Sequence, residues 1–186
     1  MRMNAYVAGV GMTRFGKQMD KTLKGLAGEA VQLALADAGL DKSALQAAWM
    51  GNAAAGIVTG QEMIRGQVAL REMGIGRIPV VNVENACASS STAFQQACAM
   101  VTAGLYDVVL ACGNEKPFHE DKLRSLGAFT SAVDVEDPDG ALNVLKSMCA
   151  DLGEPLDTAG AGVTRSIFMD IYAVMAKKHM KKYGST

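Results

Sequence analysis

The sequence alternates short apolar runs with segments of helical periodicity, and this alternation restricts the possible fold more than any other feature. The apolar runs 5–11, 46–55, 78–83 and 107–113 are predicted strands, and the segments 23–38, 61–73 and 89–103 between them are predicted helices. A helix between two strands carries the chain back over the face of the sheet, so the strands can lie parallel. The order β-α-β-α-β-α-β therefore predicts an α/β fold with a mostly parallel sheet.

The character of the sequence changes after Gly113. Residues 114–160 contain Asp-Pro, Glu-Pro and Gly turn signals, whereas residues 166–183 return to helical spacing. We therefore expect two parts. Residues 1–115 form the α/β part, and residues 116–186 form a loop-rich cap region that ends in a helix.

Composition and charge argue against several classes of protein. The formal net charge is −1, so the chain lacks the basic surplus that binds nucleic acid phosphates. No apolar run approaches the roughly 18 residues of a membrane span. The first seven residues lack the apolar segment and cleavage site of a secretory signal peptide. These features favour a globular protein without nucleic acid as its partner and without a membrane span.

The cysteines and histidines suggest neither a disulfide framework nor a metal site. The four cysteines show no C-x-x-C spacing, which favours a reduced, cytoplasmic setting. Only two histidines are present, which argues against a His-rich metal site. These residues are Cys87, Cys98, Cys112, Cys149, His119 and His179.

A cysteine lies where a predicted strand runs into a predicted helix. Cys87 follows the run 78–83 and precedes the helix 89–103, which consists mostly of small uncharged residues. The first amides of a helix lack partners and carry partial positive charge, so a thiol there is favoured as the nucleophilic thiolate. Cys87 is therefore the candidate nucleophile. The alternative is that Cys87 is one more small buried residue of an Ala/Ser-rich helix.

Residues 82–93, Asn-Val-Glu-Asn-Ala-Cys-Ala-Ser-Ser-Ser-Thr-Ala, resemble the nucleophile region of the thiolase superfamily, with the sterol-carrier-protein-type thiolases most similar. Weaker matches are the stretches 5–16, 111–115 and 168–177. The resemblance implies that Cys87 becomes acylated. It also implies that this chain forms one β-α half, with part of the cap, of a five-layered α/β/α/β/α fold.

The resemblance implies a thiolase-type acyltransferase that cleaves 3-ketoacyl-CoA or condenses acyl-CoA through an acyl-cysteine. Coenzyme A or acyl-CoA would be the substrate, and no tightly bound cofactor or metal would be needed. A homodimer is implied, formed partly by pairing of residues 80–84 with their copies in a second subunit. Edge strands of this kind need such cover.

This chain departs from the family in length, because family members are about twice as long. The general-base histidine and the second cysteine of the family lie mostly in the second half, so a second-half chain is an implied partner. Two other functions stay open. One is a non-catalytic acyl-CoA/lipid-binding or scaffold subunit beside a small zinc-and-OB-fold partner. The other is a β-ketoacyl synthase-type condensing enzyme.

The remaining candidate residues carry weaker signals. Gly9, Gly11 and Gly16 have the spacing G-x-G-x-x-x-x-G, which differs from the dinucleotide fingerprint. His119 is either a base near Cys87 or a surface residue of the cap. A cluster of lysines either meets coenzyme A phosphates or complements a helix dipole; it consists of Lys177, Lys178, Lys181 and Lys182.

The other three cysteines are interpreted as structural. Cys98 would lie about 16 Å from Cys87 along a helix, which is too far for a disulfide. Cys112 and Cys149 are expected to be small buried hydrophobes.

Overall fold

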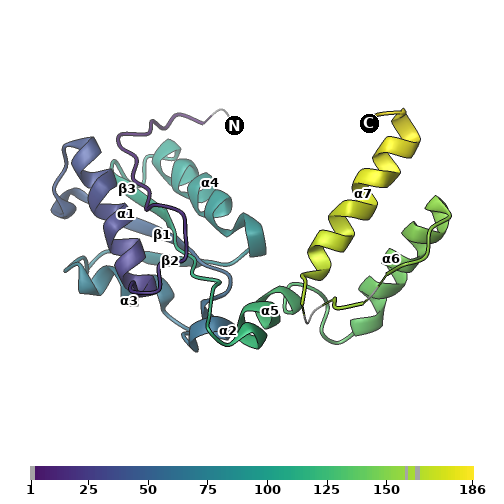
Figure 1. Ribbon diagram of the computed structural model, residues 1–186. Coiled ribbons are helices and arrows are strands. Elements are labelled where there is room, and N and C mark those ends of the chain that lie inside the picture. Colours follow the sequence, from purple (N-terminus) through teal and green to yellow (C-terminus); the bar gives the residue numbers. More distant parts are fainter. Residues whose placement is uncertain (1–2, 158, 162–163) are drawn as a thin grey trace. The chain divides into compact units, whose positions relative to one another are not determined.

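The computed structural model describes residues 3–157, 159–161 and 164–186, and these fall into two compact units (Figure 1). The first unit extends to Phe118, and the second begins at His119. The first unit contains the sheet, and the second consists of helices.

Three parallel strands form the sheet of the first unit. They are β1 (Ala47–Gly51), β2 (Val80–Val83) and β3 (Val109–Gly113), in the spatial order β2-β1-β3. Ala48 of β1 aligns with Val80 of β2 and with Leu110 of β3. The predicted α/β class with a parallel sheet is thereby confirmed.

The alternating side chains of β1 supply two hydrophobic cores. Ala48 and Met50 pack on one face with α1 (Leu23–Ala38) and α3 (Arg65–Glu72). Ala47 and Trp49 pack on the other face with α4 (Ser89–Thr102). Figure 1 shows α4 on the opposite side of the sheet from α1 and α3. All five β1 residues are buried, as expected for a central strand with helices on both faces.

The ends of the helices follow local sequence signals. Thr22 accepts a hydrogen bond from the Gly25 amide at the start of α1, and Gly39 ends that helix in the left-handed conformation. Helix α3 begins at Arg65 rather than at residue 61. A short helix, α2 (Ala55–Thr59), follows β1, so the predicted strand 46–55 ends at Gly51.

The predicted strand 5–11 is absent from the sheet. Residues 4–11 make no ladder with β3; instead Val10 N–H donates to Asp37 Oδ2 at 2.8 Å. A Cβ on Gly9 would lie 2.4 Å from Ala34 O, and one on Gly11 would lie 2.2 Å from Ala30 O. The segment therefore packs its backbone directly against α1, and within the described residues no backbone hydrogen bond joins it to a strand.

The second unit is more helical than the sequence suggested. It contains α5 (Lys122–Thr130), α6 (Pro138–Leu152) and α7 (Ile167–Tyr183). Leu145, Cys149 and Val174 form the core between α6 and α7. The expectation of a loop-rich segment over 114–160 was wrong, because Asp137-Pro138 starts a helix. Asp137 caps α6 through the Gly140 amide, and Pro138 occupies the first turn.

Gly11→Ala is expected to destabilise the first unit by about 1–3 kcal/mol, because the added methyl group would overlap the α1 backbone. Urea unfolding gives the change in free energy. Gly76→Ala is the matched control, since a Cβ on Gly76 meets no atom within 4 Å. Equal stabilities of the two variants would mean that residues 4–11 do not dock on α1.

Candidate active site

The carboxyl ends of the three strands meet at one edge of the sheet. Strands β1, β2 and β3 end at Gly51, Val83 and Gly113. Asn52 N–H donates to Val83 O at 3.1 Å, and Asn114 N–H donates to Gly51 O at 3.0 Å, so the ladder extends just past the strand ends. In parallel α/β sheets, ligands bind outside this edge.

Cys87 lies at this edge, in a short 3-10 turn, η2 (Ala86–Ala88), that links β2 to α4. The predicted strand–cysteine–helix order is confirmed. Cys87 is solvent-exposed, which contradicts the alternative of a small buried residue. Ala86 before it has a φ of 45°, and its amide donates to Glu84 Oε1 at 2.6 Å. A non-glycine residue in the left-handed region marks a sharp local bend, such as active sites often contain.

The turn that carries Cys87 is stabilised by Ser89. The Ser89 hydroxyl accepts from Asn85 N–H at 2.9 Å and donates to Ala86 O at 2.7 Å. Its side chain is buried, and Asn85 Nδ2 also donates to Thr92 Oγ1 at 2.9 Å. These bonds hold the backbone on both sides of Cys87.

Two strand-end glycines bring the start of α4 against the sheet. A Cβ on Gly51 would lie 2.9 Å from the Ser89 carbonyl carbon. A Cβ on Gly113 would lie 1.9 Å from Ser90 Oγ. Larger residues at either strand end would push this helix, and with it the Cys87 turn, away from the sheet. No local pattern marks both glycines, because Gly113 ends the apolar run 107–113 whereas Gly51 lies within the run 46–55.

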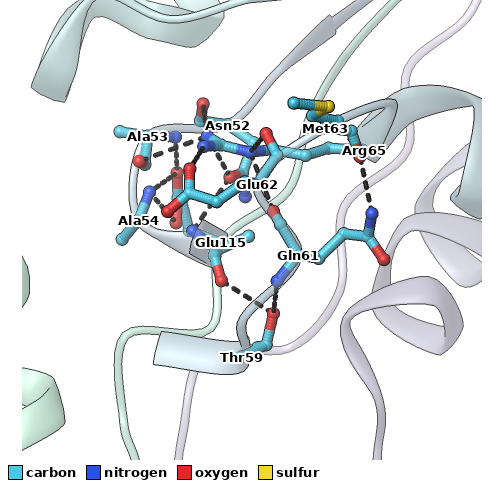
Figure 2. Close-up of polar contacts among 10 residues, drawn as sticks. Asn52, Ala53, Ala54, Thr59, Gln61, Glu62, Met63, Arg65 and Glu115 are labelled. Carbon is cyan, nitrogen blue, oxygen red and sulfur yellow. Dashed lines mark hydrogen bonds and ion pairs between the residues drawn. The ribbon is translucent and has the colours of Figure 1, made fainter. Parts of the chain in front are cut away.

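A polar network ties together the loops that follow β1 and β3 (Figure 2). Asn52 Nδ2 donates to Asn114 O at 2.6 Å. The Arg65 guanidinium donates from Nη1 to Asn52 O at 3.0 Å and to Asn52 Oδ1 at 3.1 Å. Arg65 also pairs with Glu62 through Nη2 at 3.2 Å. No sequence pattern indicated this network, because its members are far apart along the chain.

Glu115 is the acidic member of the network. Its carboxylate accepts hydrogen bonds from the backbone amides of Ala53 and Ala54. Partial burial raises the pKa of Glu115 above its ordinary value, and the nearby Glu84 carboxylate acts in the same direction. The two amides and Arg65 offset part of that rise.

The structure assigns local roles to the weaker candidates. Gly9 and Gly11 contact α1 rather than forming an open phosphate loop. His119 Nδ1 accepts from Asp121 N–H at 3.0 Å, within the second unit. Three of the four clustered lysines bind the C-terminal end of α6 or Glu154, which lies shortly after it. These contacts favour a role at a helix end over a role in binding coenzyme A phosphates. The pairs are Lys177 with Glu154, Lys178 with Asp151, and Lys181 with the Asp151 carbonyl.

The remaining cysteines are less accessible than Cys87. Cys98 is half-buried, whereas Cys112 and Cys149 are buried. Burial raises the pKa of the Cys112 thiol to about 11. Among the described residues, no cluster of three or more His, Cys, Asp or Glu side chains could hold a metal ion. Within the same residues, no helix is long and apolar enough to cross a membrane.

Comparison with known proteins places this geometry in context. Residues 5–148 match the family described as Thiolase, N-terminal domain. The chain is 34% identical over 180 residues to an acetyl-CoA acetyltransferase of Methanothermobacter thermautotrophicus, covering 97% of this chain and 40% of that protein. It is also 34% identical over 187 residues to sterol carrier protein 2 of Gallus gallus, covering 100% of this chain and 30% of that protein.

One solved structure supports the same relationship. It is described as an Ltp2-ChsH2(DUF35) aldolase, and the matching chain superposes with a TM-score of 0.56 at 25% sequence identity. The match covers 96% of this chain and 38% of that chain. The chain therefore spans less than half the length of each of these relatives.

We expect iodoacetamide to alkylate Cys87 first at neutral pH, then Cys98, and last Cys112 and Cys149. Cys87 is exposed at the start of a helix, whereas the other thiols are partly or fully covered. Peptide mass mapping after timed labelling measures the order. Labelling under denaturing conditions is the control, and it should remove the differences. Slowest labelling at Cys87 in the folded chain would contradict the exposed-nucleophile interpretation.

Glu115→Gln is expected to favour the folded state increasingly as the pH rises. Because the pKa of Glu115 is raised in the folded chain, the folded state holds that proton more tightly than the unfolded state. The stability that the folded state gains from this tighter proton binding is present below pH 4.5. It is lost as the pH rises through the folded-state pKa of Glu115. Gln has no proton to lose.

Urea unfolding of both proteins below pH 4.5 and at neutral pH tests this expectation. The unfolding free energy of the Gln variant should increase relative to that of the unsubstituted chain at the higher pH. The control is Asp20→Asn, which removes an exposed carboxylate of the first unit. Parallel pH curves for Glu115→Gln and the unsubstituted chain would contradict the prediction.

Proposed function

Because this chain belongs to the thiolase family, we propose that it is the nucleophile-bearing half of an acyltransferase that works through an acyl group on Cys87. The observation that carries the proposal is the position of Cys87. It is the exposed cysteine of the chain, in a bent turn at the carboxyl edge of a parallel sheet, directly before a helix. That arrangement presents a thiol to a ligand beside the unpaired amides at the start of a helix.

The proposed reaction has two steps. The Cys87 thiolate attacks the 3-keto carbon of a 3-ketoacyl-CoA, and a C–S bond forms. The Cα–Cβ bond then breaks, its electron pair goes to Cα, and protonation of Cα releases the CoA ester that contains Cα, while the rest of the acyl chain stays on Cys87. The thiolate of free coenzyme A next attacks the acyl-cysteine, which forms the shortened acyl-CoA and returns Cys87 as a thiolate. Condensation of acyl-CoA is the same sequence in reverse.

The start of α4 supports this chemistry electrostatically. Amides in the first turn of a helix have no intrahelical acceptor and can stabilise the negative oxygen that develops during attack. The N-cap residue of α4 is Ala88, so no N-cap side chain accepts a hydrogen bond from these amides. Coenzyme A enters as a substrate, and the steps require no tightly bound cofactor.

Proton transfer requires a base beyond Cys87, and we assign that base to the portion of the enzyme that this chain does not span. The first unit, as far as it is described, contains no histidine. The second portion of a longer thiolase would therefore complete the site. The homodimer through residues 80–84 and the cytoplasmic location stay predictions.

A second candidate function is a thiolase-like subunit that binds acyl-CoA or lipid beside a small zinc-and-OB-fold partner. The similarity to a chain of the Ltp2-ChsH2(DUF35) aldolase structure favours this candidate, because that description names two components. A β-ketoacyl synthase-type condensing enzyme is the third possibility. Use of an acyl carrier protein rather than coenzyme A would distinguish it.

Acyl transfer to Cys87 tests the proposal directly. The chain is incubated with acetoacetyl-CoA at mildly alkaline pH, with and without the C-terminal portion of the Methanothermobacter acetyltransferase. Intact mass and peptide mapping should locate a hydroxylamine-sensitive acyl group on Cys87 when that portion is present. Cys87→Ser should abolish this thioester, because a serine hydroxyl is far less nucleophilic near neutral pH.

Cys98→Ser is the matched control, since it removes a half-buried thiol from α4, the helix that follows Cys87, and should leave acylation intact. Acylation at another cysteine would contradict the role of Cys87. Binding of the second portion without any acylation would favour the non-catalytic subunit.

A further inference from the structure

Ala86, directly before Cys87, adopts a backbone conformation that an alanine rarely takes. Its φ is 45°, which lies in the left-handed region that favours glycine. A residue stays in that region only where its surroundings hold it there. The contacts of Ala86 therefore decide how the chain enters η2, the turn that carries Cys87.

Two side chains hold Ala86, one at each of its backbone polar groups. The Ala86 N–H donates to Glu84 Oε1 at 2.6 Å, and the Ala86 C=O accepts from the Ser89 hydroxyl at 2.7 Å. Because φ is the rotation about the N–Cα bond, partners on the N–H and C=O groups together restrain that torsion. A carboxylate oxygen is a stronger acceptor for an N–H group than a neutral oxygen is. Glu84 therefore supplies the stronger of the two restraints.

The Glu84 side chain makes no other hydrogen bond and no ion pair within the part of the chain that the structure describes. Arg65, the cation of the neighbouring network, pairs with Glu62 instead. Glu84 nevertheless lies close to that network. Burial raises the pKa of Glu115, and the charge of Glu84 adds to that rise. The contact that orients the Glu84 carboxylate is thus the one with the Ala86 amide.

We propose that Glu84 is a positioning residue for the nucleophile and that it acts by holding Ala86 in the left-handed conformation. Without this acceptor, φ of Ala86 is free to return to negative values. The peptide that leads into Cys87 would then turn, and the thiol would move relative to the first amides of α4. The catalytic meaning of this role rests on the proposed function, whereas the hold on Ala86 rests on the geometry alone.

Four variants separate the hold on Ala86 from the charge of Glu84 and from overall stability. Glu84→Ala removes the acceptor, whereas Glu84→Gln keeps an acceptor oxygen without the charge. Adding Ala86→Gly to Glu84→Ala makes the left-handed conformation free of steric cost. Adding Arg77→Gly to Glu84→Ala is the matched control. Arg77 also has a positive φ, 60°, but it lies before β2 and outside η2.

Acylation of Cys87 by acetoacetyl-CoA, with the C-terminal portion of the Methanothermobacter acetyltransferase present, gives the first readout. Glu84→Ala should lower the maximal rate about tenfold or more, because a displaced nucleophile reaches the attack geometry less often. The acetoacetyl-CoA concentration at half-maximal rate should change less than about twofold, since Glu84 acts on the nucleophile rather than on the bound ester. Glu84→Gln should keep most of the rate. In the Glu84→Ala chain, Ala86→Gly should restore the rate, whereas Arg77→Gly should not.

The chain alone gives a second readout that does not depend on acylation. Backbone chemical shifts of residue 86 report whether it is left-handed, and amide exchange at Asn85 reports whether the turn is closed. The Asn85 N–H donates to Ser89 Oγ, so Glu84→Ala leaves both partners of this bond in place. Exchange at Asn85 should nevertheless become about tenfold faster in Glu84→Ala. It should slow again when Ala86→Gly is added.

Several outcomes decide the proposal. Left-handed shifts and slow Asn85 exchange in Glu84→Ala would mean that Ser89 alone holds the turn, which would overturn it. Equal losses of rate in Glu84→Gln and Glu84→Ala would assign the effect to the charge, and rescue by Arg77→Gly would assign it to overall stability; either result would also overturn it.

Two further cases keep the test decisive. Loss and rescue of the turn in a chain whose Cys87 is never acylated would support the hold on Ala86 and contradict the proposed function. If Glu84→Ala does not fold, exchange of the Ala86 amide in the unsubstituted chain decides the question. Slow exchange would support its bond to Glu84, and exchange as fast as that of a free amide would contradict it.

Discussion

The parallel pairing of β1 with β2 and β3 is the constraint on which the first unit depends. All five residues of β1 are buried, and their alternation divides the interior into two cores. Met50 packs so closely under α3 that a Cβ on Gly66 would lie 2.6 Å from the Met50 Cβ. Because the three strands run in the same direction, their carboxyl ends also lie at the same edge of the sheet. The position of the candidate site therefore follows from the same pairing that builds the core.

The exposure of Cys87 follows from how α4 meets that edge. Gly51 and Gly113 leave room for the first residues of α4, so the helix can begin directly on the strand ends. The connection from β2 must then turn within a few residues, and Ala86 takes a left-handed conformation to do so. Ser89 holds this turn from inside, which leaves Cys87 on the outside. A buried serine and an exposed cysteine are thus two consequences of one bend.

The two edges of the sheet have different surroundings. Beyond β2, the edge residues Val80 and Val81 are only partly covered, and the predicted pairing with a second subunit would involve this edge. Beyond β3, a cavity of about 530 Å³ lies between the sheet and residues 4–11. The predicted dimer would cover backbone groups that the β2 edge leaves unpaired.

Local sequence signals determined most of the elements and the candidate nucleophile. Helical periodicity predicted α1 and α4 nearly to their ends, and continuous apolar runs predicted β1, β2 and β3. The junction around Cys87 was also visible, because a strand and a helix on either side of a cysteine are local features. Local signals were misleading at Asp137-Pro138, since the pair suits both a turn and the first turn of a helix.

Only the tertiary structure decided which neighbours each element has. Residues 5–11 have the composition of a strand, but a strand requires a partner edge, and in the described chain a cavity lies between them and β3 instead. The network of Asn52, Arg65 and Glu115 was equally invisible, because it joins the loops after β1 and β3 to the first residue of α3 through backbone contacts that no spacing encodes. The sequence by itself determined the elements and the cysteine at their junction, because both depend on near neighbours. The exposed thiol, the close approach of α4 and the cavity beside β3 depend on contacts between distant segments, and folding alone decided them.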